Sequence, residues 1–226
     1  MREIKMLETY IQDYNEAVFE TDKITALAVV NKALESGITP EDIVFKLIIP
    51  AVEIMMERIE KDPDSNLAQH FMTAQIAAEV TERMLEKFAI PPTVIGKVII
   101  GAAHGDLHSL GKRIVIGCLK SLMVEVIDLG INVSAEKFVD TAVTEQAQVI
   151  AISAMMVHTA TGESGSLKVR ALLKERGLEE QIKIAVGGAP YRFDPELYLK
   201  VGANGWAPDG VTAAKIIVQL INEVKP

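Results

Sequence analysis

The sequence predicts an α/β protein in which an N-terminal four-helix bundle precedes a five-stranded parallel sheet. Residues up to about 90 carry apolar positions at helical spacing only. The prolines Pro91 and Pro92 then interrupt the pattern, because consecutive prolines disfavour helix and stiffen a link. Beyond them, short β-rich runs alternate with helical stretches, which is typical of a parallel sheet with helical crossovers. The chain is long enough for one large core or two small ones.

The first ninety residues contain four helical patterns. In the first pattern, apolar residues recur three and four positions apart, and Thr21 or Asp22 can cap the second helix. Thr39 and Pro40 mark the start of the third helix, since threonine caps helices and proline fits the first helical position. Residues 62–64 break this helix, and the fourth pattern follows. Helices with such short connections form a small antiparallel bundle.

The second half alternates between strands and helices. The expected strands are residues 94–102, 124–129, 149–153, 182–186 and 205–207. The expected helices are residues 110–122, 135–146, 167–176, 195–201 and 211–224. We therefore expect a helical domain over residues 1–90 and a sheet domain over residues 91–226. Because ligands bind outside the carboxyl ends of parallel strands, the loops that follow the strands are expected to hold the chemistry.

Composition and charge exclude several classes of function and site. Lys and Arg number 23 against 31 Asp and Glu, and the net charge of −8 argues against binding to nucleic acid, which requires a basic face. The single cysteine, Cys118, excludes an internal disulfide and any site with several thiolate ligands in one chain. No apolar run approaches the roughly 20 residues of a membrane span. The charged N-terminal segment does not resemble a signal peptide, so a cytoplasmic protein is expected.

The loop after the first strand is rich in polar groups. Asp106 and His108 are two residues apart, so their side chains can point the same way in an extended loop. A carboxylate that accepts from one imidazole nitrogen fixes the tautomer and leaves the other nitrogen as a ligand. Gly105 and Gly111 flank the pair and permit tight turns or the close approach of a flat ligand. A polar loop whose aspartate merely caps the next helix would have the same sequence.

A zinc site is the second alternative for this loop. His104 and His108 have the four-residue spacing of a helical metal pair, and His158 could complete a site. Helix is not expected at His104, which precedes Gly105 at the exit of a strand. No glutamate lies between the two histidines, as the zinc-protease pattern requires. These features argue against zinc.

Two further loops lie at the same predicted edge. Residues 153–159 bring the hydroxyls of Ser153 and Thr159 to the end of the third strand. Gly187 and Gly188 follow the fourth strand, where missing side chains let backbone approach a ligand or simply let the chain turn. Each signal is weak alone. Three such loops on one edge of a sheet predict a binding site.

Residues 105–112, Gly-Asp-Leu-His-Ser-Leu-Gly-Lys, contain the DxHxxG motif of cobalamin-binding proteins. Ser153-x-Met155 and Gly187-Gly188 follow in the order of that family, and residues 126–130 also look like it. With the helical module in front, the whole chain resembles the corrinoid proteins of anaerobic methyltransferase systems. Their layout is similar to that of the B12-binding region of methionine synthase, and the resemblance implies a Rossmann-like (flavodoxin-like) sheet domain.

The resemblance also implies roles for individual residues. His108 would replace the base of the cofactor as the lower axial ligand of cobalt, and Asp106 would bond its far nitrogen. Thr159 stands where a hydroxyl commonly completes the relay. The other implied contacts to the cofactor and its nucleotide tail are Gly105, Leu107, Ser109, Gly111, Ser153, Met155, Val157, Gly187, Gly188 and Ala189, with His70 and Met72 as cap contacts. Asn204 departs from the family pattern, which has an aspartate there.

The implied function is methyl transfer. A protein of this kind carries cobalamin as cob(I)alamin or methylcobalamin, bound base-off/His-on. It takes a methyl group from a donor-specific methyltransferase, such as an O-demethylase system, and passes it to an acceptor methyltransferase that uses tetrahydrofolate or a thiol. A reductive activase is a further implied partner, and the Pro91–Pro92 link is expected to act as a hinge. The alternatives are the small cobalamin-binding subunit of a B12-dependent mutase and a cobalamin storage or sensing module.

Overall fold

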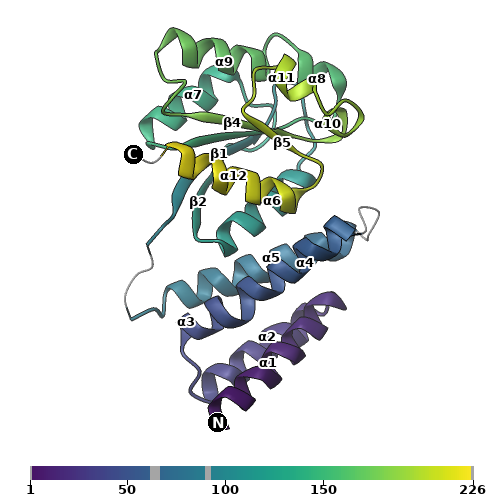
Figure 1. The fold of residues 1–226 in the computed structure, drawn as a ribbon, viewed down its shortest axis with the longest axis vertical. Coiled ribbons are helices and arrows are strands. Elements are labelled where there is room, and N and C mark those ends of the chain that lie inside the picture. Colours follow the sequence, from purple (N-terminus) through teal and green to yellow (C-terminus); the bar gives the residue numbers. More distant parts are fainter. Residues whose placement is uncertain (1, 62–66, 90–92, 225–226) are drawn as a thin grey trace. The chain divides into compact units, whose positions relative to one another are not determined.

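The computed structural model describes residues 2–61, 67–89 and 93–224, and these residues form two compact units (Figure 1). The helical unit comprises residues 1–93 together with 120–122, and the sheet unit comprises residues 94–119 and 123–226. Pro91 and Pro92 lie outside the described residues, so the hinge expected there stays a prediction. The placement of the expected boundary between residues 90 and 91 likewise stays a prediction.

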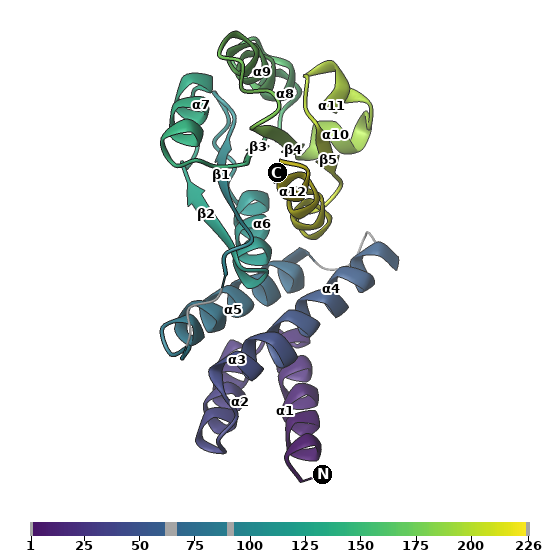
Figure 2. The same ribbon diagram turned by 60° about the vertical axis from the view of Figure 1, so that its left-hand side comes forward.

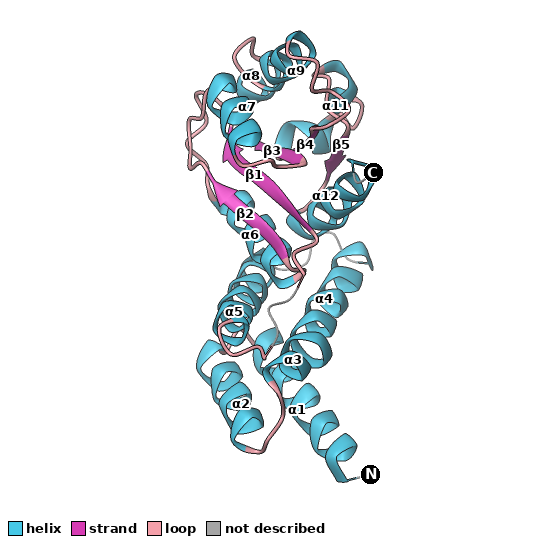
Figure 3. Ribbon diagram, turned by 90° about the vertical axis from the view of Figure 1, so that its left-hand side faces the viewer, coloured by secondary structure: helices cyan, strands magenta, loops and turns pink. Residues whose placement is uncertain are grey.

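The helical unit contains the expected helical segments (Figure 3). They are α1 (Arg2–Phe19), α2 (Lys23–Glu35), α3 (Pro40–Asp42), η1 (Ile43–Ile48), α4 (Ile49–Lys61) and α5 (Leu67–Leu85). Asp22 caps α2, because its side chain accepts from the Thr25 N–H at 3.0 Å. Thr39 caps α3 by accepting from the Asp42 N–H at 3.1 Å. Both caps lie where the sequence predicts them.

The third expected helix has a different form. It begins as α3, widens into the π-helical segment η1 and continues as α4. Pro50 has no N–H to donate within α4, and just before it the Ile49 N–H reaches back five residues to the Val44 carbonyl. The proline therefore explains why one predicted helix appears as three consecutive helical segments.

The sheet unit contains five parallel strands in the order β2-β1-β3-β4-β5. They are β1 (Gly96–Ala102), β2 (Val124–Asp128), β3 (Val149–Ser153), β4 (Lys183–Gly187) and β5 (Gly205–Ala207). This order is that of the flavodoxin-like doubly wound fold, in which the chain reverses direction across the sheet between β1 and β3. The expected strands are all present, although the first begins two residues later than predicted.

Helices cover both faces of this sheet (Figure 2). On one face lie α7 (Ala135–Thr144) and α9 (Ser166–Glu175), and on the other lie α6 (Leu110–Ser121) and α12 (Gly210–Val224). Phe138 of α7, Leu173 of α9 and Ile150 of β3 belong to one buried apolar cluster. Burial on both faces explains why the strands read as continuous apolar runs and not as alternating ones.

Three short helices occupy the loops. The sequence predicts loops where α8 (Val157–Thr161) and α10 (Ala189–Phe193) lie, and a helix over residues 195–201 where the shorter α11 (Leu197–Lys200) lies. Such short pieces lack the apolar periodicity that makes longer helices predictable. Among the described residues, no helix combines the length and apolar character that a bilayer span requires.

Candidate cobalamin site

Three loops meet at the carboxyl edge of the sheet. In the parallel register, Ala102 of β1 pairs with Ser153 of β3, and Ser153 pairs with Gly187 of β4. The three strands therefore end at the same level. The loop with Asp106 and His108, the segment 154–159 and the glycine pair emerge side by side, as the sequence predicts.

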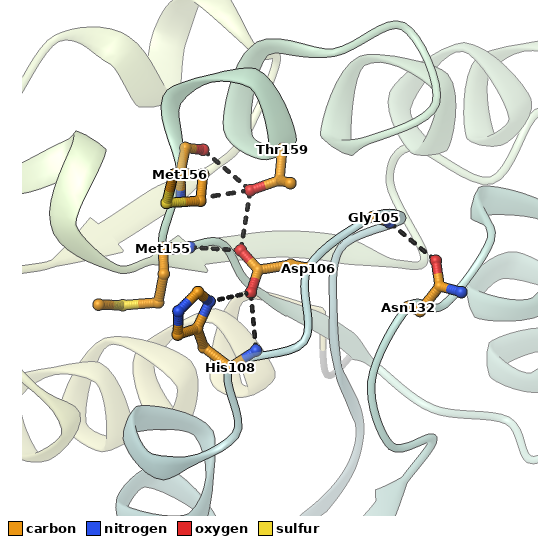
Figure 4. A network of polar contacts seen from close by, with 7 residues as sticks. All are labelled: Gly105, Asp106, His108, Asn132, Met155, Met156 and Thr159. Carbon is orange, nitrogen blue, oxygen red and sulfur yellow. Dashed lines mark hydrogen bonds and ion pairs between the residues drawn. The ribbon is translucent and has the colours of Figure 1, made fainter.

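Asp106 is the centre of a hydrogen-bond network (Figure 4). Its Oδ1 accepts from the backbone N–H of His108 at 2.9 Å and contacts the Nδ1 of the same residue at 2.9 Å. Its Oδ2 accepts from the Met155 N–H at 2.6 Å and from the Thr159 hydroxyl at 2.8 Å. Two bonds come from its own loop and two from the loop after β3, so the carboxylate joins two neighbouring loops.

These bonds keep Asp106 ionised although it is buried, with its side chain 1% exposed. Burial alone raises the pKa of this carboxyl group. The N–H groups of Met155 and His108, with the Thr159 hydroxyl and the His108 ring, outweigh burial and lower the pKa to about 2. At neutral pH Asp106 is therefore an acceptor only.

The ionised partner fixes the tautomer of His108. Because the carboxylate can only accept, the hydrogen of a neutral His108 ring lies on Nδ1, and Nε2 keeps its lone pair. The His108 side chain is 57% exposed, and the second ring nitrogen points away from Asp106 (Figure 4). The arrangement presents a nitrogen that could act as a ligand, with the tautomer and orientation of its ring fixed by the carboxylate behind it.

Thr159 is held in place by the short helix α8. Its backbone N–H donates to the Met156 carbonyl at 3.1 Å, and its hydroxyl lies 2.8 Å from the same carbonyl. The hydroxyl has one hydrogen for two acceptors, the Met156 carbonyl and the Asp106 carboxylate. The residue itself is buried, so this contact is shielded from water.

The glycines at this edge differ in what the fold requires of them. Gly188 has a φ of +121°, and a Cβ there would lie 1.9 Å from the Ala154 carbonyl oxygen. A Cβ on Gly111 would meet nothing within 4 Å, and one on Gly187 would meet only the Ala207 oxygen at 3.7 Å. The fold therefore demands glycine at 188, whereas Gly111 and Gly187 leave open space that packing does not explain.

Exposed apolar side chains follow β1 and β3, two of the strands that end at this edge. Large hydrophobic residues are exposed in the segments that follow β1 and β3, up to the first residues of α6 and α8, namely Leu107, Leu110, Met155, Met156 and Val157. Exposed apolar groups gathered at one edge are typical of a binding surface. A flat, largely apolar ligand with one metal centre suits this combination of exposed hydrophobics, missing side chains and one free imidazole nitrogen.

The other residues named in the sequence analysis lie in both units and differ in their exposure. Ser109 is exposed, and Ala189 is half-buried at the start of α10. His70 is buried and Met72 is half-buried on α5 of the helical unit. Asn204 lies at the opposite edge of the sheet, before β5, where its Oδ1 accepts from the Ile184 N–H at 2.8 Å. Its departure from the family pattern therefore does not affect the edge at which the three loops meet.

The alternative reading of Asp106 as a helix cap is wrong. Its carboxylate accepts from the Met155 N–H and from His108, which precedes α6, and not from the first turn of that helix. As for zinc, the described part of the chain contains no group of three or more His, Cys, Asp or Glu side chains placed to hold a metal ion.

Sequence reasoning missed the support from the loop after β2. Asn132 accepts from the Gly105 N–H at 2.8 Å through its Oδ1 (Figure 4). Lys112 of α6 is 3% exposed and forms an ion pair with Asp128. Asp128 lies in the family-like segment 126–130, which could have drawn attention to it. No sequence pattern marks Asn132 as a partner of Gly105, because this contact depends on a turn in which Asn132 has a φ of +52°.

Comparison with known protein families assigns both units. Residues 96–215 match the B12 binding domain family, and residues 10–63 match a second B12 binding domain family. The dimethylamine corrinoid protein of Methanosarcina barkeri is 34% identical over 95% of this chain and 98% of its own length. Trimethylamine corrinoid protein 1 of Methanosarcina acetivorans is 32% identical over 83% of this chain and 86% of its own length.

Solved structures share the fold. A cobalamin-binding protein from Desulfitobacterium hafniense has a TM-score of 0.73 at 20% identity, covering 93% of this chain and 98% of that one. A chain of the methanol:cobalamin methyltransferase complex MtaBC from Methanosarcina barkeri also has a TM-score of 0.73, at 25% identity, covering 95% of this chain and 80% of that one. The motif residues, the fold and these relatives agree: the chain belongs to the family of B12-binding corrinoid proteins, and its cofactor is cobalamin.

Proposed function

We propose that the chain is the methyl carrier of a methyltransferase system and binds cobalamin base-off/His-on, with His108 as the lower axial ligand. The observation that carries this proposal is the exposed His108 ring whose Nδ1 is held by the buried, ionised Asp106. Cobalamin, when bound, supplies a cobalt centre that can accept and release a methyl group. The chain supplies the ligand, its orientation and a surrounding surface.

The network behind His108 suits a ligand that must stay in one orientation. Asp106 has four hydrogen-bond donors around two oxygens, and they come from two loops. Rotation of its carboxylate would break several bonds at once, so the imidazole is held against a rigid acceptor. The Thr159 hydroxyl lies within hydrogen-bond distance of both Asp106 and the Met156 carbonyl, so its one hydrogen can be donated to either acceptor.

Open space supports the proposed contacts with the macrocycle and the nucleotide tail. Gly111 follows the proposed axial ligand by three residues, and a Cβ there would meet nothing within 4 Å. Gly187 leaves space next to Ser153, its partner in the sheet, where the tail is proposed to pass. The exposed side chains of Leu107, Met155 and Val157 would exclude water from the bound ring system.

The methyl donor is proposed from the relatives. The curated relatives at 32–34% identity are trimethylamine and dimethylamine corrinoid proteins, which favours a methylamine as the donor. The other candidate donor is a methoxylated aromatic compound, which an O-demethylase system would use. The proposed partners are a donor methyltransferase, an acceptor methyltransferase that uses tetrahydrofolate or a thiol, and a reductive activase. The proposal includes a cytoplasmic location, which cell fractionation tests.

Cobinamide tests the axial ligand directly, because it lacks the nucleotide tail and its base. Any nitrogen bound to cobalt in a complex with cobinamide must come from the protein. We expect the visible spectrum of the wild-type complex to show a nitrogen ligand and that of His108→Ala to lack it. His104→Ala and His158→Ala are matched controls, since both histidines are exposed and lie in the same two loops. A nitrogen-ligated spectrum from His108→Ala would contradict the assignment.

Methyl transfer tests the carrier role. Methylated donors should transfer a methyl group to the cobalamin-loaded chain only in the presence of a donor methyltransferase, with at most one group per bound cofactor. Parallel reactions with methylamines and methoxylated aromatics, each with its own methyltransferase, distinguish the two candidate donors. Turnover by the loaded chain alone would contradict a carrier role.

A further inference from the structure

The loop that carries His108 is anchored at both ends by one short segment, residues 128–132, which runs from the last residue of β2 to the Ala103–Val133 bridge. The first anchor precedes His108 in the chain. The Asn132 side chain accepts from the Gly105 N–H at 2.8 Å, and the Asn132 N–H donates to the Asp106 carbonyl at 3.0 Å. These two bonds fix the backbone of the turn from which the His108 loop begins.

The second anchor follows His108. Lys112 lies in the first turn of α6, with its side chain 3% exposed, and its ammonium group contacts both carboxylate oxygens of Asp128, with Oδ2 at 2.5 Å. Lysine is seldom buried without a partner, and a cation in the first turn of a helix is disfavoured by the helix dipole. The position of Lys112 therefore depends on Asp128, and the start of α6 is tied to the end of β2.

The two anchors are mechanically connected. The Oδ1 of Asp128 also accepts from the Gly130 N–H at 2.8 Å, and the Gly130 carbonyl accepts from the Ala102 N–H at 3.0 Å. The turn between them uses positive φ angles at Gly130, +85°, and at Asn132, +52°. The segment 128–132 is thus a folded turn braced against β1, and it holds Gly105 on one side of His108 and Lys112 on the other.

We infer that Asp128, Asn132 and Lys112 are positioning residues for the axial ligand: together they set where the Nε2 of His108 is presented. Asp106 orients the ring directly, whereas these three residues orient the loop from a neighbouring strand. This inference rests on the proposed ligation by His108. The Asn132 bonds go to the backbone of Gly105 and Asp106, and the Asp128–Lys112 pair ties the start of α6, whereas the printed bond of the His108 ring is to Asp106.

Amide hydrogen exchange in the chain without cofactor tests the anchors. In Asp128→Asn, which leaves the atoms of the Gly105–Asn132 bond unchanged, we expect the Gly105 and His108 amides to exchange about tenfold faster, as for the loss of one net hydrogen bond. Asn132→Ala should accelerate the His108 amide by a similar factor, and Asn132→Asp, which keeps the acceptor oxygen, should restore it. The matched control is Glu125→Gln, an exposed carboxylate of the same strand that pairs with Lys97 at 3.0 Å.

Axial ligation provides the second readout. Histidine labelled with nitrogen-15 would give bound cob(II)alamin a two-line hyperfine splitting in its electron paramagnetic resonance spectrum, distinct from the three lines of an ordinary nitrogen base. We expect the two-line fraction to fall in Asn132→Ala and Asp128→Asn and to return in Asn132→Asp. Fluorescence of Trp206, the single tryptophan of the chain, checks that the sheet unit is folded in every variant.

The outcomes separate this inference from the proposed function. Exchange of the His108 amide within twofold of wild type in both Asn132→Ala and Asp128→Asn would overturn the positioning role. If only Asp128→Asn fails to fold, the comparison of Asn132→Ala with Asn132→Asp decides whether the positioning role holds. A wild-type complex without the two-line signal would overturn ligation by His108, and the exchange data would still decide whether the segment 128–132 anchors the loop.

Discussion

Asp106→Asn is the substitution from which the structure yields the sharpest prediction. The carboxylate accepts from four donors, whereas an amide has one acceptor oxygen and one donor nitrogen. If the amide nitrogen takes the place of Oδ2, the Met155 N–H loses its acceptor. If it takes the place of Oδ1, the His108 N–H loses its acceptor and the His108 ring must accept at Nδ1. The hydrogen would then lie on Nε2, which could no longer bind a metal.

The magnitude follows from two independent arguments. Leaving one backbone N–H without a partner costs about 1–3 kcal/mol. Lowering the pKa of Asp106 from 3.8 to about 2 stabilises the folded state by about 2 kcal/mol at neutral pH, at about 1.4 kcal/mol for each pKa unit. We therefore expect Asp106→Asn to lower the free energy of unfolding of the sheet unit by about 2 kcal/mol at pH 7.

The pH dependence has a definite sign. Because the pKa of Asp106 is lowered in the folded state, its stabilisation is complete above the unfolded pKa of about 3.8 and is lost as the pH falls through about 2. The difference between wild type and Asp106→Asn should therefore shrink by about 1 kcal/mol between pH 7 and pH 3. In this pH range the variant has no titrating group at position 106.

Urea unfolding followed by Trp206 fluorescence measures the effect, since the tryptophan lies in β5 of the same unit. The matched control is Asp140→Asn, because Asp140 is 60% exposed and pairs with Arg176 at the surface of that unit. An exposed pair of this kind contributes about 1 kcal/mol or less. Unfolding free energies within about 0.5 kcal/mol of wild type for Asp106→Asn, or a difference that does not change with pH, would refute the reasoning.

Three further predictions concern single residues of the sheet unit. Gly188→Ala should lower the free energy of unfolding by about 3 kcal/mol or more, because its Cβ would overlap the Ala154 carbonyl. Gly187→Ala should fold normally and should bind cobalamin more weakly while its affinity for cobinamide is unchanged. Equal stability of the two variants would contradict this prediction. Thr159→Val should cost about 2 kcal/mol in urea unfolding through the lost bond to a charged carboxylate, and Thr159→Ser should recover most of it. Burial raises the pKa of the Cys118 thiol to about 12, so a thiol reagent should label it only as fast as the sheet unit opens, and rapid labelling of the folded chain would disagree.

Strong periodic patterns made most of the fold predictable. The apolar runs of β1 and β3 and the amphipathic pattern of α7 reflect burial of one face or both. Buried positions carry apolar residues, so the sequence shows directly which positions are buried. The caps at Asp22 and Thr39 were equally readable, because a capping side chain acts within three residues of itself. Pro50 is a local signal too, but the π-helical segment before it depends on how the helix accommodates the missing N–H.

The contacts of the candidate site also divide into those that local sequence predicts and those that depend on tertiary structure. Asp106 and His108 are close in the chain, so their contact could be predicted from spacing and was found at 2.9 Å. The Thr159 contact joins residues 53 positions apart. The loop order allowed a hydroxyl after β3 to bond this carboxylate or to be an ordinary turn residue, and the family resemblance singled out Thr159. Asn132 and Lys112 were not predicted, because their contacts depend on a turn with positive φ angles and on the pairing of β2 with β1.

The sequence by itself determined the class of fold, the edge of the sheet that carries the loops, and the Asp106–His108 pair, since these follow from short-range patterns and from the rule for parallel sheets. Only the tertiary structure decided which glycine is required by the backbone, which nitrogen of His108 is free, and which distant side chains hold its loop. Those features depend on distances between segments far apart in the chain, and no local pattern of residues encodes such distances.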